Sequence, residues 1–387
     1  MRRILNSLLA VLAAAPASLP AQTRGFLVRL GVDTFAVERL TRRGNRVDGE
    51  VVRHTPSTTV LRYALRFNPD GTVASYEEGI FLADGSPAPP ASDGTSQARM
   101  TMTFTGDSVI REWTRGGQPV VVRNAAPKWT LPAVGGTSPY WQELAIDAVK
   151  RSGQSDLRFY TVSPQQQAPN VIPARIIGAD SAELIPGGFR RGYRLGRDGH
   201  LLRGDASLTT VKLLMTPIRD ANIAAIARAW AAKDAAGAGM GVASTRDTVR
   251  AAIGLANVSI DYGRPARRGR QIWGKLVPFD TVWRFGANAA AQLTTDHDLE
   301  IGGAALPAGS YSLWLLPSAG QSYLIVNAQT GQWGTMYDSS KDVVRIPVSR
   351  HVVAGSREER FRVSIDAGKL LMVWDDGGYE VPLTGRP

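Results

Sequence analysis

The chain has 387 residues, with 45 Lys and Arg against 34 Asp and Glu, a formal net charge of +11 and no cysteine. This length allows two or three domain-sized cores, and the lack of cysteine excludes disulfide scaffolds and thiol chemistry. Forty Gly and 23 Pro are typical of a turn-rich, strand-rich protein rather than a helical one.

Residues 1–21 have the pattern of a secretory signal peptide. Arg2 and Arg3 are followed by an apolar stretch that is too short and too interrupted to span a bilayer. We expect cleavage after Ala21, or alternatively after Ala17, and no transmembrane segment after cleavage. An uncleaved anchor is the other interpretation. The protein is therefore expected to be exported, to the periplasm or the extracellular medium.

The basic charge predicts the kind of partner that an exported protein would meet. Positive surfaces attract anionic polymers and lipid headgroups. We therefore expect a glycan, an anionic lipid or a cell-envelope polymer as partner. Nucleic acid is not expected, because export separates the protein from it.

Residues 24–216 are expected to form one β-rich domain. Residues 47–52 and 61–67 alternate apolar and polar side chains over part of their length, the period of a half-buried strand, and turn sequences occur at 68–71 and 197–200. Repeated hairpins of this kind predict an antiparallel meander or half-barrel. Such a sheet with a covering helix is similar to the open half-barrels that carry lipids in the envelope, a likeness of fold alone.

One helix is expected within this domain. Ser138 is a suitable N-cap, Pro139 suits the first helical position and Gly153 suits the C-terminal end. Residues 83–96, rich in Pro, Ser, Asp and Gly, are expected to be a loop or hairpin tip.

Residues 217–245 are expected to link two domains. An apolar stripe predicts a helix over 219–236 with Asp220 as its cap. The Gly-rich run at 237–241 then predicts a flexible break.

Residues 246–384 are expected to form an antiparallel β-sandwich, because short strands follow one another without intervening helices. A hairpin turn is expected at 375–378. The expected strands are 256–262, 290–296, 309–316, 321–328, 342–348, 359–366, 369–375 and 378–383.

Within this second domain, residues 261–288 read DYGRPARRGRQIWGKLVPFDTVWRFGAN, and related Gly, Tyr and Trp positions continue through 301–313 and 332–338. In this signature, residues 246–384 resemble a bacterial exported domain family of unknown function. The resemblance implies no reaction, cofactor or catalytic residue. The N-terminal domain resembles no family that we can name.

The signature also supplies candidate ligand contacts. Arg offers a fixed fork of donors for acid groups, and Trp or Tyr offers a stacking face for a sugar ring. The alternative interpretation is that the Arg side chains bond main-chain carbonyls and Asp, while the Trp side chains form the core. The candidates are Tyr262, Arg264, Arg270, Trp273, Trp283, Arg284, Asn288, Trp333 and Tyr337.

Arg267 and Arg268 lie between Ala and Gly, so we expect both side chains to face water. With Arg264 and Arg270 they would form a basic patch for an anionic lipid or polymer, or simply a solvated turn.

Motifs of covalent and metal chemistry are weak in this sequence. Asp296-His297-Asp298 is the best metal-ligand cluster, but neighbours in a strand face opposite ways, so no metal or other cofactor is expected. The sequence around Ser310, Gly-Ser-Tyr-Ser, lacks the second Gly of the Gly-x-Ser-x-Gly nucleophile elbow. We therefore expect a non-catalytic binding or structural protein of the cell envelope. The alternative is an envelope hydrolase that cleaves glycans with an acidic pair brought together only by the fold.

Overall fold

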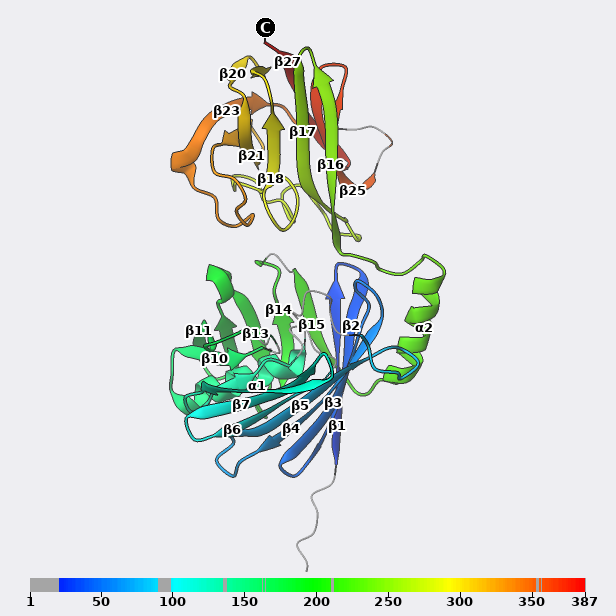
Figure 1. Cartoon of the computed structure of the whole chain (residues 1–387), viewed down its shortest axis with the longest axis vertical. Coiled ribbons are helices and arrows are strands. Elements are labelled where there is room, and N and C mark those ends of the chain that lie inside the picture. Colours follow the sequence, from blue (N-terminus) through cyan, green and yellow to red (C-terminus); the bar gives the residue numbers. More distant parts are fainter. Residues whose placement is uncertain are drawn as a thin grey trace, which may run out of the picture.

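The computed structural model describes residues 21–89, 99–134, 138–161, 163, 165–209, 212–352, 355 and 357–386. The expected signal segment, up to residue 20, and part of the 83–96 loop lie outside these ranges. The molecule is mainly β, as predicted, and has two domains that lie end to end, with helix α2 at one side (Figure 1). Neither helix in the described ranges is long and apolar enough to cross a membrane.

The N-terminal domain begins with a meander of eight strands, each paired antiparallel with the next along the chain. They are β1 (Gln22–Leu30), β2 (Asp33–Arg43), β3 (Arg46–Arg53), β4 (Thr59–Phe67), β5 (Val73–Phe81), β6 (Arg99–Thr105), β7 (Ser108–Arg115) and β8 (Gln118–Ala125).

A second run of strands extends the same sheet, because β15 pairs with the free edge of β1, with Val28 opposite Met215. The result is a single 15-stranded sheet, antiparallel except for the pair of β9 and β10. Its remaining strands are β9 (Leu131–Pro132), β10 (Asp156–Tyr160), β11 (Asn170–Ile177), β12 (Ser181–Leu184), β13 (Arg191–Leu195), β14 (Leu201–Asp205) and β15 (Leu213–Ile218), with a short 3-10 helix, η1 (Pro186–Gly188).

Helix α1 (Pro139–Ser152) packs its apolar side chains into the core of the curved sheet, together with side chains from both runs of strands (Figure 1). The predicted caps are confirmed. Ser138 accepts a hydrogen bond from the Trp141 N–H, and Gly153 ends the helix in the left-handed conformation, with φ of 68°.

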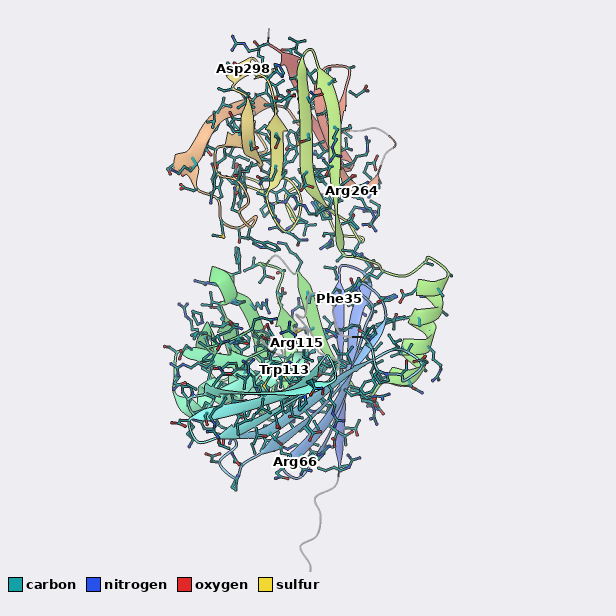
Figure 2. The ribbon with its side chains drawn as sticks, in the orientation of Figure 1. Phe35, Arg66, Trp113, Arg115, Arg264 and Asp298 are labelled. Carbon is teal, nitrogen blue, oxygen red and sulfur yellow. The ribbon has the colours of Figure 1, made fainter. Side chains whose placement is uncertain are left out.

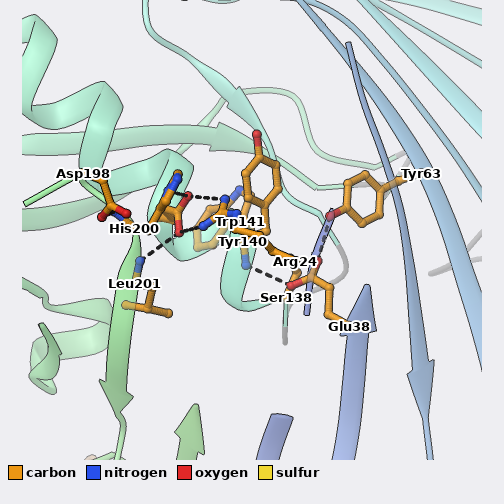
Figure 3. Close-up of polar contacts among 10 residues, drawn as sticks. Arg24, Glu38, Tyr63, Ser138, Tyr140, Trp141, Asp198, His200 and Leu201 are labelled. Atoms are coloured by element: carbon orange, nitrogen blue, oxygen red, sulfur yellow. Dashed lines mark hydrogen bonds and ion pairs between the residues drawn. The ribbon is translucent and has the colours of Figure 1, made fainter. Parts of the chain in front are cut away.

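The start of α1 is fixed by a buried carboxylate on β2. Glu38 is fully buried and accepts hydrogen bonds from the Ser138 hydroxyl at 2.6 Å, the Tyr140 N–H at 2.9 Å and the Tyr63 hydroxyl at 2.8 Å (Figure 3). Gly49 provides the room for Tyr63, since a Cβ at this position would lie 2.1 Å from the tyrosine ring. Three donors therefore satisfy a group that burial would otherwise penalise.

Helix α2 (Ile223–Ala235) covers the other face of the sheet at β2–β4, where Val37, Val52 and Val60 pair across the strands and contact Ile223. The predicted cap was wrong. Asn222, not Asp220, accepts the hydrogen bond from the Ala225 N–H, because Asp220 is held two residues earlier by an ion pair with Arg39.

The C-terminal domain has two antiparallel sheets with a shared apolar core. One sheet contains β16 (Ser244–Ile253), β17 (Ala256–Pro265), β18 (Ala291–Thr295), β21 (Gly309–Leu316), β22 (Ser322–Asn327) and β23 (Asp342–Val348). The other contains β19 (Leu299–Ile301), β20 (Ala304–Leu306), β24 (His351–Val352), β25 (Glu358–Asp366), β26 (Lys369–Asp375) and β27 (Gly377–Gly385), and a 3-10 helix, η2 (Ser339–Lys341), precedes β23.

Residues 266–290 join β17 to β18 without forming a regular strand, although single bridges such as Trp283 with Leu315 attach them to the sheets. The last residues of β17 lie close to the end of this segment. A Cβ on Gly263 would lie 2.2 Å from the Ala287 carbonyl oxygen, so only glycine fits there.

The same segment contacts the N-terminal domain. The Val32 N–H, in the turn between β1 and β2, donates to the Arg268 carbonyl at 3.1 Å, and Asp33 forms an ion pair with the Arg268 guanidinium. A Cβ on Gly31 would lie 2.3 Å from the same carbonyl oxygen. The turn therefore fits closely against the signature segment.

Candidate functional site

The large aromatic side chains of the signature belong to the core of the second domain. Tyr262, Trp273 and Trp283 are at most 9% exposed. Trp283 stacks on Trp374 at 6.0 Å and meets Phe361 edge-on at 5.1 Å. These three candidates therefore hold the fold together and offer no open face to a ligand.

Two of the signature arginines are satisfied by the protein itself. Arg264 forms an ion pair with Asp247 at 3.0 Å and donates to the Phe361 carbonyl. Arg270 donates to two main-chain carbonyls of its own turn, at 2.5 and 2.8 Å. Both side chains hold an irregular segment in place, as in the structural interpretation of the signature.

The expectation that Arg267 and Arg268 face water is wrong. Arg268 is only 8% exposed, because Asp33 of the other domain covers its guanidinium. Arg267 is about three-quarters buried and lies 3.6 Å from Glu359. Asp33 and Glu359 are distant in sequence, so the local sequence of this turn predicts solvent-exposed arginines.

Arg284 differs from these neighbours. Among the described residues no carboxylate pairs with its guanidinium, and its buried Nε, like those of Arg267 and Arg268, has no hydrogen-bond partner. A Cβ on Gly334 would lie 2.0 Å from Arg284 Cδ, so the side chain runs tightly beneath the backbone there. Burial lowers the pKa of Arg284.

Lys212 of the N-terminal domain adds a second cation, one that sequence reasoning missed. It lies in the connection between β14 and β15, and its ammonium donates to the Ser207 carbonyl at 2.9 Å. Burial lowers the pKa of Lys212, and the positive charges of Arg284 and Arg270 lower it further. Lys212 of the N-terminal domain therefore experiences the charges of two arginines of the C-terminal domain. Glu359 and Asp33 act on Arg270, whereas no acid among the described residues acts on Arg284.

We call Lys212, Arg270 and Arg284 the junction site. Asn288 and Trp333 lie at its edge, because the Gly334 N–H donates to the Asn288 carbonyl and Trp333 bridges to the residue after Asn288. Trp333 is 46% exposed, unlike the other signature tryptophans. Clustered cations beside an open indole are suited to an acid group attached to a ring.

Tyr337 lies outside the junction site. Its hydroxyl donates to Asp342 at 2.7 Å, and its ring packs against Trp314 at 4.9 Å. This candidate is engaged by its own sheet.

The Asp296-His297-Asp298 segment is used structurally. Asp296 accepts hydrogen bonds from Asn257 and from His297, while Asp298 accepts one from the Ala308 N–H. Figure 2 shows Asp298 at the end of the second domain that faces away from the first. The described ranges contain no group of three or more His, Asp or Glu placed to hold a metal ion.

Residues 244–383 match the model of a family described as a protein of unknown function (DUF2911), and the N-terminal region matches no family model. The resemblance of the C-terminal domain to a family of unknown function is thus confirmed. No curated protein matches the chain.

Two solved structures show distant likenesses. A β-barrel-like protein of a domain of unknown function (DUF1849) from Brucella abortus has 8% identity and a TM-score of 0.31, covering 51% of this chain and 95% of that chain. A putative AttH from Nitrosomonas europaea has 8% identity and a TM-score of 0.12, covering 98% of this chain and 99% of that chain. Neither likeness bears on the function.

Proposed function

We propose that this chain is an exported, non-catalytic binding protein of the cell envelope that holds an anionic polar ligand at the junction site. The observation that carries the proposal is Arg284, a largely buried guanidinium with no counter-charge in the described residues. An unpaired buried charge costs several kcal/mol, and an incoming acid group removes that cost.

An acidic glycan fits this chemistry best. Carboxylate or sulfate oxygens accept hydrogen bonds from the forked N–H groups of Arg284, and Lys212 contributes a second positive charge. The exposed face of Trp333 suits the apolar side of a sugar ring. Anionic lipid headgroups and other acidic envelope polymers share the acid group but lack the ring.

The test is thermal unfolding of the chain from residue 22 onwards, in sodium sulfate or trigalacturonate against sodium chloride of equal ionic strength. We expect both anions to raise the unfolding temperature of the wild type more than that of Arg284→Gln and Lys212→Gln. Arg250→Gln, at an exposed position on β16, is the matched control and should behave as the wild type.

Equal stabilisation of the wild type and Arg284→Gln would show only the general effect of these salts on folding, and the proposed site would be wrong. A response to sulfate without one to trigalacturonate would overturn the glycan assignment.

The export part of the proposal has its own test. Cell fractionation followed by mass spectrometry of the N-terminus should find the protein outside the cytoplasm, beginning at Gln22. A cytoplasmic protein that retains Arg2 and Arg3 would contradict export.

The alternative, a glycan hydrolase, requires two carboxylates that face each other across a cleft. Glu143 and Asp147 both line a pocket in the N-terminal domain, but each is held in an ion pair, with Arg24 and Arg151 respectively. This engagement favours binding over hydrolysis.

A further inference from the structure

A pocket of about 510 Å3 lies beside α1 in the N-terminal domain, and none of the junction-site residues lines it. Its walls come from α1, from the β2–β3 and β4–β5 turns, and from the β13–β14 turn. This volume is within the range of small-molecule sites. We call it the α1 pocket.

Glu143 of α1 binds several groups of the pocket wall, and its partners Arg24, His200 and Leu201 are labelled in Figure 3. Its carboxylate accepts two hydrogen bonds from Arg24, at 2.7 and 3.0 Å, one from the Leu201 N–H at 2.9 Å and one from His200 Nδ1 at 3.0 Å. A carboxylate held by Arg24 can only accept, so Nδ1 of His200 carries the hydrogen. The other ring nitrogen, Nε2, is then the acceptor in neutral histidine, and no described residue bonds it.

Tyr140 presents a second group without a partner. Its ring is buried, but no described residue hydrogen-bonds its hydroxyl, which is not enclosed. Burial raises the pKa of Tyr140 and the charge of Arg42 lowers it, and both residues line the pocket.

Arg42 is free to take an acid group. It donates at 3.2 Å to the Gly44 carbonyl and lies over the ring of Phe67, but no carboxylate among the described residues pairs with it. The other two arginines of the pocket are neutralised by Glu143 and Asp147.

The acceptors come from the β13–β14 turn. Asp198 uses one carboxylate oxygen to accept the His200 N–H at 3.0 Å, and its other oxygen has no partner in the described ranges. The pocket thus combines donors on Arg42 and Tyr140 with acceptors on His200 and Asp198. A ligand that satisfies both sides has an acid group and neighbouring hydroxyls.

We propose that the α1 pocket binds a small sugar acid or hydroxy acid, with the carboxylate on Arg42 and the Tyr140 hydroxyl and a ligand hydroxyl donating to His200 Nε2. This site goes beyond the junction site and does not depend on it. Glu143 acts as a positioning residue, since it fixes the tautomer and orientation of His200.

The test is titration calorimetry of the chain from residue 22 onwards with D-glucuronate as the probe. Binding of glucuronate, with at least 10-fold weaker binding of D-glucose and of acetate, is the expected result, because each comparator lacks one half of the recognised chemistry. Equal binding of acetate would overturn the hydroxyl part of the proposal. No heat with glucuronate at millimolar concentrations would overturn the whole.

Three variants locate the site. Tyr140→Phe removes only a hydroxyl without a protein partner, so the fold should be unchanged while affinity falls roughly 10-fold. Arg42→Met should weaken binding about 10- to 100-fold. His200→Asn keeps a donor for Glu143 but removes Nε2, and should cost roughly 3- to 10-fold.

Arg203→Gln, on the exposed side of β14, is the control and should bind as the wild type. Unchanged affinity in Tyr140→Phe and Arg42→Met would place glucuronate elsewhere and sink the proposal. Arg284→Gln should keep its affinity for glucuronate, so failure at the junction site and failure here are distinguishable.

Discussion

At the scale of single residues, the N-terminal core contains carboxylates that a hydrophobic interior ordinarily excludes. Glu78 is 4% exposed and accepts a hydrogen bond from the Tyr76 hydroxyl. Burial raises the pKa of Glu78 from its ordinary value of 4.5 to about 7. The folded chain therefore holds a proton at this position that the unfolded chain releases between these two pH values.

This proton makes stability depend on pH. The stabilisation is complete below pH 4.5 and is lost as the pH rises through 7. Glu78→Gln keeps an acceptor for Tyr76 and cannot ionise. We expect the free energy of unfolding of the wild type, relative to this variant, to fall by about 3 kcal/mol between pH 4.5 and 8.

Urea unfolding of both proteins at several pH values gives the comparison. Parallel pH profiles would mean that Glu78 does not change its proton affinity on folding. Glu38 shares the raised pKa, of about 7, from the same burial, so part of the wild-type slope should remain in the variant.

At the scale of elements, the close approach of β17 to the end of the signature segment predicts that stability is sensitive to an added side chain at Gly263. Gly263→Ala would force a methyl group onto the Ala287 carbonyl, and backbone atoms cannot move aside cheaply. We expect a loss of about 1–3 kcal/mol from the stability of the C-terminal domain. Thermal unfolding followed by tryptophan fluorescence reports it, because Trp273 and Trp283 lie in this core.

Gly320→Ala is the matched control, since nothing lies within 4 Å of a Cβ at this position and its backbone is not left-handed. The two variants should differ clearly in unfolding temperature. Equal temperatures would mean that the contact between Gly263 and Ala287 relaxes without cost.

The elements that sequence reasoning predicted well are those with local signals. α1 begins and ends at the predicted caps because Ser138 and Gly153 act on their own helix. β16 was missed, since it is an edge strand whose Thr-Arg-Asp-Thr run shows no buried alternation. The sequence suggested Asp220 as the cap because its ion-pair partner, Arg39, lies 181 residues away and is not apparent from the local sequence.

At the scale of the whole molecule, the two domains meet where the β1–β2 turn fits the signature segment. Arg268→Ala removes the ion pair with Asp33 and exposes the junction. We expect an increased radius of gyration in small-angle X-ray scattering and faster proteolysis of residues 237–243. Arg250→Ala is the control, and an unchanged scattering profile in Arg268→Ala would show that the domains are held together without this pair.

The candidate site was predictable only in part, because its residues are far apart along the sequence. The signature identified Arg284 and Trp333, but Lys212 comes from the other domain and carries no local motif. In the α1 pocket, His200 and Glu143 are 57 residues apart, so only the folded sheet brings them together. Trp273 and Trp283 are buried and therefore cannot stack on a ligand, and composition alone does not distinguish a core indole from an exposed one.

The pairing of β1 with β15 has a consequence for biosynthesis. β1 is synthesised nearly 200 residues before β15, so the edge of β1 that pairs with β15 has no partner until β15 has been made. Bare edges of this kind invite pairing with foreign chains. Completion of the sheet therefore waits for β15, and until then this edge of β1 is open to other chains.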